Sequence, residues 1–236
     1  MTNSVSGRAR LVLHGFTSRA SRVASDDTVS IRAGETRDVR FVADRVGTFY
    51  YWASSDDDPR LGDRRGIDSQ LSGALIVDPA DGPAHNDRVF VIASWAGRVG
   101  AAGVQVNRFV INGKSWPYTE RLSYAVGDSV RFRVLNVGFG AHPMHLHGFY
   151  YNVDSRGDGL SDSLFAATSS PHLVNTERLT TGRTFALTWI PTRDGNWLFH
   201  CHDPVHIAAG PGLDGSPPTP DADLPHDHLT EMRPDR

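Results

Sequence analysis

The chain has 236 residues, a formal net charge of −3 and a hydrophobic share of 39%. That length allows one large or two small globular domains with buried cores. The slightly negative charge offers no basic field for nucleic acid, and no apolar run is long enough to span a membrane. Cys201 is the single cysteine, which excludes an intramolecular disulfide. The first sixteen residues show no apolar segment of a signal peptide.

Short strands are expected along nearly the whole chain. The clearest runs, in chain order, are TRDVRFVAD (36–44), GTFYYWAS (47–54), SVRFRVLNV (129–137) and RTFALTWIP (183–191). In the third run Val130, Phe132 and Val134 alternate with two arginines, a pattern typical of a strand with one buried face. Glycine-containing turns separate the runs, and no segment has a sustained helical stripe. Short strands at roughly 8- to 12-residue spacing indicate an all-β sandwich architecture.

A boundary is expected within VDPADGPAHNDR (77–88), a stretch rich in Pro, Gly and Asp between two strand-like runs. It predicts an N-terminal domain over residues 1–80 and a C-terminal domain over residues 86–236. The two halves also share a layout of turn, strand, glycine turn and aromatic-led strand, seen at 31–54 and 179–202. Repetition of one supersecondary unit predicts two similar domains in tandem.

Histidines gather in two short segments of the C-terminal half. The segment AHPMHLHGF (141–149) contributes His142, His145 and His147, and the segment HCHDPVH (200–206) contributes His200, Cys201, His202 and His206. Because side chains alternate across a strand, His200 and His202 are expected on one face and the Cys201 sulfur on the other. This arrangement predicts two metal sites placed back to back and joined by the Cys–His peptide.

Two imidazoles and one thiolate form the ligand set of a blue, or type 1, copper site. His142, Cys201 and His206 fit that set, and the pairs His145/His147 and His200/His202 would form an all-nitrogen site suited to copper. Cysteine with histidine also suits zinc, but a structural zinc site rarely needs a His-Cys-His run that faces both ways. Isolated histidines such as His85 and His172 are expected to be solvated or hydrogen-bonded side chains.

The segments HPMHLHG and HCHDPVH, the latter after a GNWLF strand, resemble the third and fourth copper motifs of the multicopper oxidases, laccase-like enzymes built from cupredoxin domains. The resemblance extends over most of the chain. It implies two tandem cupredoxin-like Greek-key β-sandwiches, the first abbreviated. It also implies oxidation of a small-molecule or metal-ion donor at the type 1 copper, with electrons passing through Cys201, His200 and His202 to a type 2/type 3 centre that reduces dioxygen. His145, His147, His200 and His202 match ligands of that centre.

The first two copper motifs of the family are degenerate here. The first motif, His-x-His-Gly, is represented by VLHG, in which Val12 takes a histidine position and only His14 remains. The second has Trp52 and Ser54 where histidines would stand. Three of eight trinuclear ligands are therefore absent. The resemblance then implies a smaller site of one or two coppers, or a site completed by His226 and His228 of the tail, from this or another subunit.

The fourth ligand position of the type 1 site is also unusual. The family places Met, Leu or Phe ten residues after the cysteine, and this chain has Pro211, so the copper would be three-coordinate unless Met232 folds back. A missing axial ligand predicts a relatively high reduction potential. Both ends look abbreviated against the family, which together with the resemblance favours a homotrimer, and a periplasmic or secreted location is implied.

Three hypotheses follow from these residues. The first is a laccase-type copper oxidase with a diminished cluster, favoured by the four histidines. The second is a type 1 copper electron-transfer protein without oxidase activity, favoured by Val12, Trp52 and Ser54. The third is a non-redox metal-binding or structural protein, and a structural role would leave the His-Cys-His run unexplained.

Overall fold

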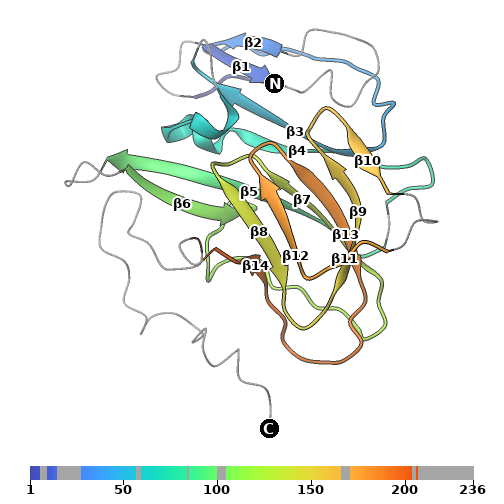
Figure 1. Ribbon diagram of the computed structural model, residues 1–236. Coiled ribbons are helices and arrows are strands. Elements are labelled where there is room, and N and C mark those ends of the chain that lie inside the picture. The colour runs from blue at the N-terminus through green and yellow to red at the C-terminus, as the bar shows by residue number, and fades with distance from the viewer. Residues whose placement is uncertain are drawn as a thin grey trace.

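A computed structural model shows a nearly all-β protein, which confirms the predicted fold class (Figure 1). The structure describes residues 1–5, 10–14, 28–56, 60–83, 85–99, 105–165, 171–203 and 206. Among these residues, no helix is long and apolar enough to cross a membrane.

The N-terminal part forms a four-stranded antiparallel sheet in the order β2-β1-β3-β4. Its strands are β1 (Arg10–His14), β2 (Thr28–Arg32), β3 (Gly47–Ser54) and β4 (Ser72–Val77), with short 3-10 helices η1 (Leu61–Asp63) and η2 (Gly66–Gln70) between β3 and β4. The strand expected at 36–44 is wrong, because residues 37–46 form no strand and Val42 is 68% exposed. A β-branched run supplies propensity only, and a strand also needs a neighbouring ladder to pair its backbone groups.

Two further sheets form the C-terminal part. The larger has the order β10-β9-β13-β7-β5-β6, with β11 also paired to β9, and the smaller has the order β12-β8-β14. The larger sheet contains β5 (Asp87–Val99), β6 (Gln105–Ile111), β7 (Val130–Asn136), β9 (Tyr151–Gly157), β10 (Asp162–Leu164), β11 (Leu173–Val174) and β13 (Thr184–Trp189). The smaller contains β8 (Ala141–Leu146), β12 (Thr176–Thr180) and β14 (Phe199–Cys201).

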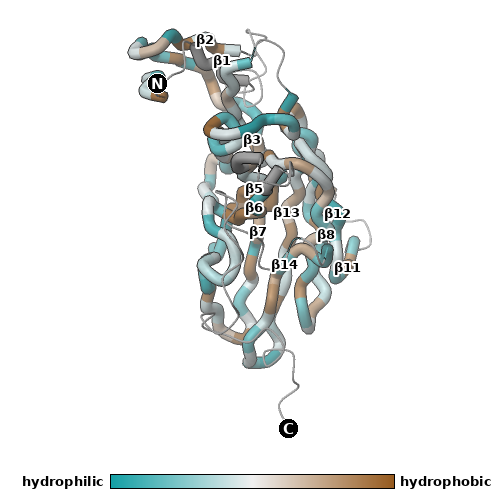
Figure 2. Tube along the Cα trace, turned by 90° about the vertical axis from the view of Figure 1, so that its left-hand side faces the viewer, coloured by the Kyte–Doolittle hydropathy of each residue, from teal (hydrophilic) through white to brown (hydrophobic). Residues whose placement is uncertain are grey.

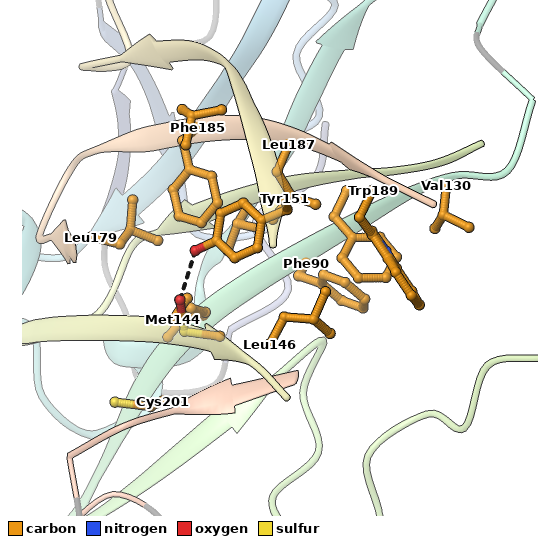
Figure 3. Packing of buried hydrophobic residues seen from close by; sticks show 14 residues of the cluster. Phe90, Val130, Met144, Leu146, Tyr151, Leu179, Phe185, Leu187, Trp189 and Cys201 are labelled. Carbon is orange, nitrogen blue, oxygen red and sulfur yellow. Dashed lines mark hydrogen bonds between the residues drawn. The ribbon is translucent and has the colours of Figure 1, made fainter. Parts of the chain in front are cut away.

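The main core lies between these two sheets. Val130, Phe132 and Val134 are buried in it, as their alternation predicts, and Met144 and Cys201 reach it from the smaller sheet. Figure 3 shows the Tyr151 hydroxyl directed at the carbonyl of Met144, to which it donates a 2.8 Å hydrogen bond. The core therefore fixes the spacing between the larger sheet and the two strands that carry the histidines.

The opposite face of the larger sheet packs against the N-terminal sheet. Leu135 of β7 and Val137, just after that strand, belong to a second buried cluster that also contains Tyr50 and Trp52 of β3. Strand β7 is therefore covered on both faces, which explains why nearly all its side chains are buried. The predicted boundary at 77–88 falls between β4 and β5. That the two halves are separate domains stays a prediction.

The molecule is elongated, with β1 and β2 at one end and β14 toward the other (Figures 1 and 2). The strand that carries His14 is thus remote from the strand that carries His200 and Cys201. This separation decides which histidines one copy of the chain can bring together.

Candidate metal centre

The pairing of β8 with β14 sorts the histidines onto two faces. The register places Cys201 opposite Met144 and His200 opposite His145. Along β8 the side chains alternate, so that His142, Met144 and Leu146 are buried while His145 is partly exposed. Cys201 is buried and its neighbour His202 is exposed. The two-sided arrangement expected from strand alternation is therefore present.

On the buried side, His142, Cys201 and His206 converge. One nitrogen from each imidazole and the Cys201 Sγ all lie within 4.8 Å of one another, and Cys201 Sγ lies 3.2 Å from His206 Nδ1. Within the described part of the chain, this is the one group of three or more ligand-type side chains that meets so closely. The structure thus brings together the three residues that sequence reasoning assigned to one site.

The tautomer of His142 suits metal binding. Its Nε2 lies 3.3 Å from the Phe139 carbonyl, and an Nε2–H that donates there leaves the lone pair on Nδ1. Burial, followed by the charge of His206, lowers the pKa of His142 to about 4. Burial also lowers the pKa of His206. Both imidazoles are therefore neutral at neutral pH, which is the form that binds metal ions.

The thiol of Cys201 has the opposite tendency. Burial raises its pKa, so the thiol is the favoured form while it has no cation beside it. A bound cation would reverse this preference by stabilising the thiolate. A soft thiolate with two imidazoles in a buried three-membered set matches type 1 copper, so these residues fit that group.

Phe109 of β6 was not singled out by the sequence and borders the triad. Its ring centroid is 3.9 Å from that of His206 and 5.4 Å from that of His142. A large aromatic side chain at this point packs against both imidazoles and restricts their movement. Its sequence signal is its place at the start of the apolar run Phe109–Ile111, which predicts a strand and no role at the site.

On the other face, four histidines form a more open group. Ring centroids of neighbouring pairs lie 4.9 to 5.8 Å apart among His145, His147, His200 and His202. His147 Nε2 and His200 Nε2 are 2.9 Å apart, so the two rings present nitrogens to the same point. This four-histidine face contains the pairs that the sequence assigned to a second site.

Hydrogen bonds orient this face. His200 Nδ1 lies 2.8 Å from the Cys201 carbonyl and His145 Nδ1 lies 2.8 Å from Thr176 Oγ1. Each bond occupies Nδ1 and turns Nε2 outward, as second-shell partners do for metal-binding histidines. Burial lowers the pKa of His200 to about 4 and also lowers that of His145. Neutral imidazoles with outward Nε2 atoms fit a nitrogen-ligated copper.

The degenerate motif positions of the N-terminal sheet also come together. Val12 pairs with Ser54 and His14 pairs with Trp52 in the β1–β3 register. The side chains of β1 lie outside the described residues. Trp52 is 6% exposed and Ser54 is fully buried. The four positions at which the family would place histidines are therefore neighbours in this sheet.

At these positions the side chains of Trp52 and Ser54 interact with Arg64 and Asp68. The Arg64 guanidinium lies 5.3 Å from the Trp52 ring centroid, and Ser54 Oγ donates to Asp68 Oδ2 at 3.1 Å. Burial lowers the pKa of Arg64 to about 10, and the charge of Asp68 partly opposes that effect. An indole, a hydroxyl and a cation do not fit copper, so no copper is assigned to these positions.

Of the other residues named from the sequence, four lie outside the described residues: Pro211, His226, His228 and Met232. His172 Nε2 lies 2.9 Å from a guanidinium nitrogen of Arg156, which confirms the expected hydrogen-bonded histidine.

The fold and the two histidine-bearing strands define a cupredoxin-type copper protein. The structure resembles a multicopper oxidase known as mgLAC, with a TM-score of 0.67 and 25% identity over 92% of this chain and 68% of that one. It also resembles the blue copper oxidase of Nitrosomonas europaea, with a TM-score of 0.65 and 21% identity over the same shares of the two chains. The second likeness bears on the fold alone.

Residues 94–213 match the sequence profile of the multicopper oxidases, and the chain belongs to that family. Laccase-6 of Oryza sativa subsp. japonica is 36% identical over 97 residues, which cover 38% of this chain and 17% of the laccase. The chain thus matches about a sixth of that relative's length. Copper is the cofactor that the family implies.

Proposed function

We propose that the chain is a laccase-like copper oxidoreductase that oxidises a reducing donor one electron at a time and reduces dioxygen. The observation that carries the proposal is the convergence of His142, Cys201 and His206 within 4.8 Å, with Cys201 at the end of β14 between His200 and His202. Four electrons and four protons would convert one dioxygen to two waters, so four one-electron donors are consumed per turnover.

The protein's own contribution is to hold and separate two ligand sets. Copper bound to them would supply reversible one-electron chemistry, which no side chain of the triad supplies alone. The triad lies at the edge of the core between the sheets, and Phe109 packs against its imidazoles. The four-histidine face is reached from Cys201 through one peptide bond on either side. That short covalent path is the feature that connects donor oxidation to a second metal site.

We further propose that the second site has fewer copper ligands than that of the family and is completed between copies of the chain. The four-histidine face belongs to β8 and β14, whereas the strand of His14 lies at the other end of the molecule (Figure 1). One copy therefore does not bring His14 to this face, and a neighbouring copy could. A closed homotrimer, as the family resemblance implies, would repeat that contact three times.

A type 1 electron-transfer protein without oxidase activity is the alternative. The specific observation in its favour is that Trp52 and Ser54 are engaged by Arg64 and Asp68, in place of copper ligands. The triad alone is sufficient for this function, and the four-histidine face would then bind no copper.

Copper content per chain after loading, read with the paramagnetic resonance spectrum and oxygen uptake, separates these functions. The oxidase predicts at least two coppers per chain and oxygen uptake with a phenolic donor. One blue copper without oxygen uptake would establish the carrier and exclude the oxidase. A colourless chain that binds zinc in preference to copper would exclude both.

Two matched variants sharpen this experiment. Cys201→Ser should remove the blue absorbance and the type 1 signal, because the thiolate is their source. His147→Ala should leave the blue absorbance in place while lowering both the copper count and oxygen uptake. If His147→Ala leaves the copper count and oxygen uptake unchanged, the four-histidine face is not the second site.

A further inference from the structure

The smaller sheet places a row of polar side chains across its three strands, on the side of the four-histidine face. The register pairs Thr176 of β12 with His145 of β8, and His145 with His200 of β14. Residues that are directly opposite in an antiparallel pair project to the same face. Strand β12 contains no histidine, and it lies on the other side of β8 from β14 (Figure 1). It therefore reaches the four-histidine face through Thr176.

Hydrogen bonds connect Asn175 to His145 through the Thr176 hydroxyl. Thr176 Oγ1 donates to Asn175 Oδ1 at 3.1 Å and lies 2.8 Å from His145 Nδ1. A hydroxyl has one proton to donate, and the oxygen of a side-chain amide can only accept. With that proton directed at Asn175, the Thr176 oxygen is left to accept from the imidazole. His145 must then carry its proton on Nδ1.

The backbone of Asn175 favours the same tautomer. Burial, followed by the charge of His202, lowers the pKa of His145, and a hydrogen bond from the ring to the Asn175 carbonyl opposes this shift. The ring is therefore neutral at neutral pH and carries a single proton. Because a carbonyl can only accept, it too favours that proton on Nδ1. The lone pair then remains on Nε2, where it is available to a metal ion.

We propose that Thr176 and Asn175 are positioning residues of the second site, which hold His145 in the tautomer with a free lone pair on Nε2. The inference rests on the proposed function in one respect, since it requires copper on the four-histidine face. A metal-binding histidine usually donates its other ring N–H to a carboxylate, a carbonyl or water. In this chain a hydroxyl from a strand without histidines accepts that hydrogen bond, so neither histidine segment reveals it.

The tautomer of His145 in the copper-free full chain is the first test. Nuclear magnetic resonance of the ring nitrogens measures it, and His145→Gln assigns the signals. The parent ring should carry its proton on Nδ1. Thr176→Val keeps the branched shape without the hydroxyl and should move a large part of the population to the Nε2–H tautomer, whereas Thr176→Ser should retain the parent state. A parent ring with its proton on Nε2 overturns the inference. So does an unchanged ring in Thr176→Val, which would show that the Asn175 carbonyl alone fixes the tautomer.

Substitutions of Asn175 test the direction of the hydrogen bonds. Asn175→Asp keeps an acceptor beside Thr176 and should retain the parent tautomer. Asn175→Ala frees the Thr176 hydroxyl to donate to His145 Nδ1 and should shift the population as Thr176→Val does. A parent tautomer in Asn175→Ala would overturn the role of Asn175. Thr180→Val is the matched control, since Thr180 lies on the same strand opposite Ala141, and it should match the parent.

Copper titration of the same variants measures the consequence for the second site. Thr176→Val should weaken copper binding beyond the triad by about 10- to 100-fold, the usual cost of losing such a partner. The blue band of the type 1 site should stay unchanged, and Thr176→Ser should restore the affinity. Equal affinity in the parent and Thr176→Val overturns the inference and leaves the proposed function in place. A parent chain that binds no copper beyond the triad overturns the oxidase and the positioning role together.

Discussion

Replacing Arg64 by methionine should lower the free energy of unfolding by about 3–5 kcal/mol, the usual cost of removing one partner from a buried ionic group. The side chain is 4% exposed and lies over the Trp52 ring. Its guanidinium donates four hydrogen bonds of 2.8 to 3.0 Å, to the carbonyls of Leu61, Asp68, Leu71 and Val137. Methionine fills much of the space but satisfies none of these carbonyls.

The magnitude follows from what the substitution leaves behind. A hydrogen bond from a charged donor contributes about 1.5–3 kcal/mol net, and four that share one side chain are not additive. The Asp68 carboxylate would also lose its nearby cation. The Val137 bond joins the 3-10 helical segment to the larger sheet, so its loss loosens the packing that the second buried cluster provides.

Urea unfolding of the copper-free chain, followed by tryptophan fluorescence, measures this loss. The urea concentration at the midpoint of unfolding should fall, while the slope of the free energy of unfolding against urea concentration stays constant. Arg65→Met is the matched control, since Arg65 is exposed and its removal should change stability by less than about 0.5 kcal/mol. A loss below about 1 kcal/mol for Arg64→Met would show that the buried guanidinium is not a structural element.

Two other predictions concern pH and close packing. In the copper-free chain the pKa values of His142 and His200, each about 4, lie below the ordinary value near 6.5, so the unfolded chain binds more protons between these limits. The free energy of unfolding should therefore fall as pH drops from about 6.5 to about 4 and change little between about 7 and 8. Denaturant unfolding at a series of pH values that shows no such fall would refute this prediction. Gly138→Ala should destabilise the chain by about 1–3 kcal/mol, because its Cβ would lie 2.5 Å from the Ser94 backbone nitrogen and 2.8 Å from the Ala93 carbonyl carbon, and a thermal unfolding curve that matches the parent would contradict this clash.

The side of the strand on which each triad residue lies could be predicted, because alternation is a local property, whereas the meeting of the three residues depends on the pairing of β8 with β14. Strand alternation places Cys201 away from His200 and His202 whatever the rest of the fold is. The same rule places His142 on one face of β8 and His145 on the other. The donor atoms suit copper or zinc, and membership of the multicopper oxidase family implies copper.

The first copper motifs illustrate the opposite case. Their loss of histidine is plain in the sequence at Val12, Trp52 and Ser54, but the sequence does not show what replaces it. Arg64 follows Trp52 by twelve positions and reaches it only because the segment between β3 and β4 turns back over the sheet. Contacts of that kind depend on loop geometry, which no periodic pattern encodes.

The sequence by itself determined the all-β class, the alternation of the strands and the donor atoms of the two histidine segments. Tertiary structure decided that residues 37–46 form no strand, that the larger sheet is covered on both faces, and that a cavity lined by both apolar and charged side chains adjoins the triad. The physical reason is the distance along the chain over which each property is determined. Side-chain alternation and donor chemistry are properties of a few neighbouring residues, whereas strand pairing, burial of a second face and the shape of a cavity depend on residues far apart in the chain.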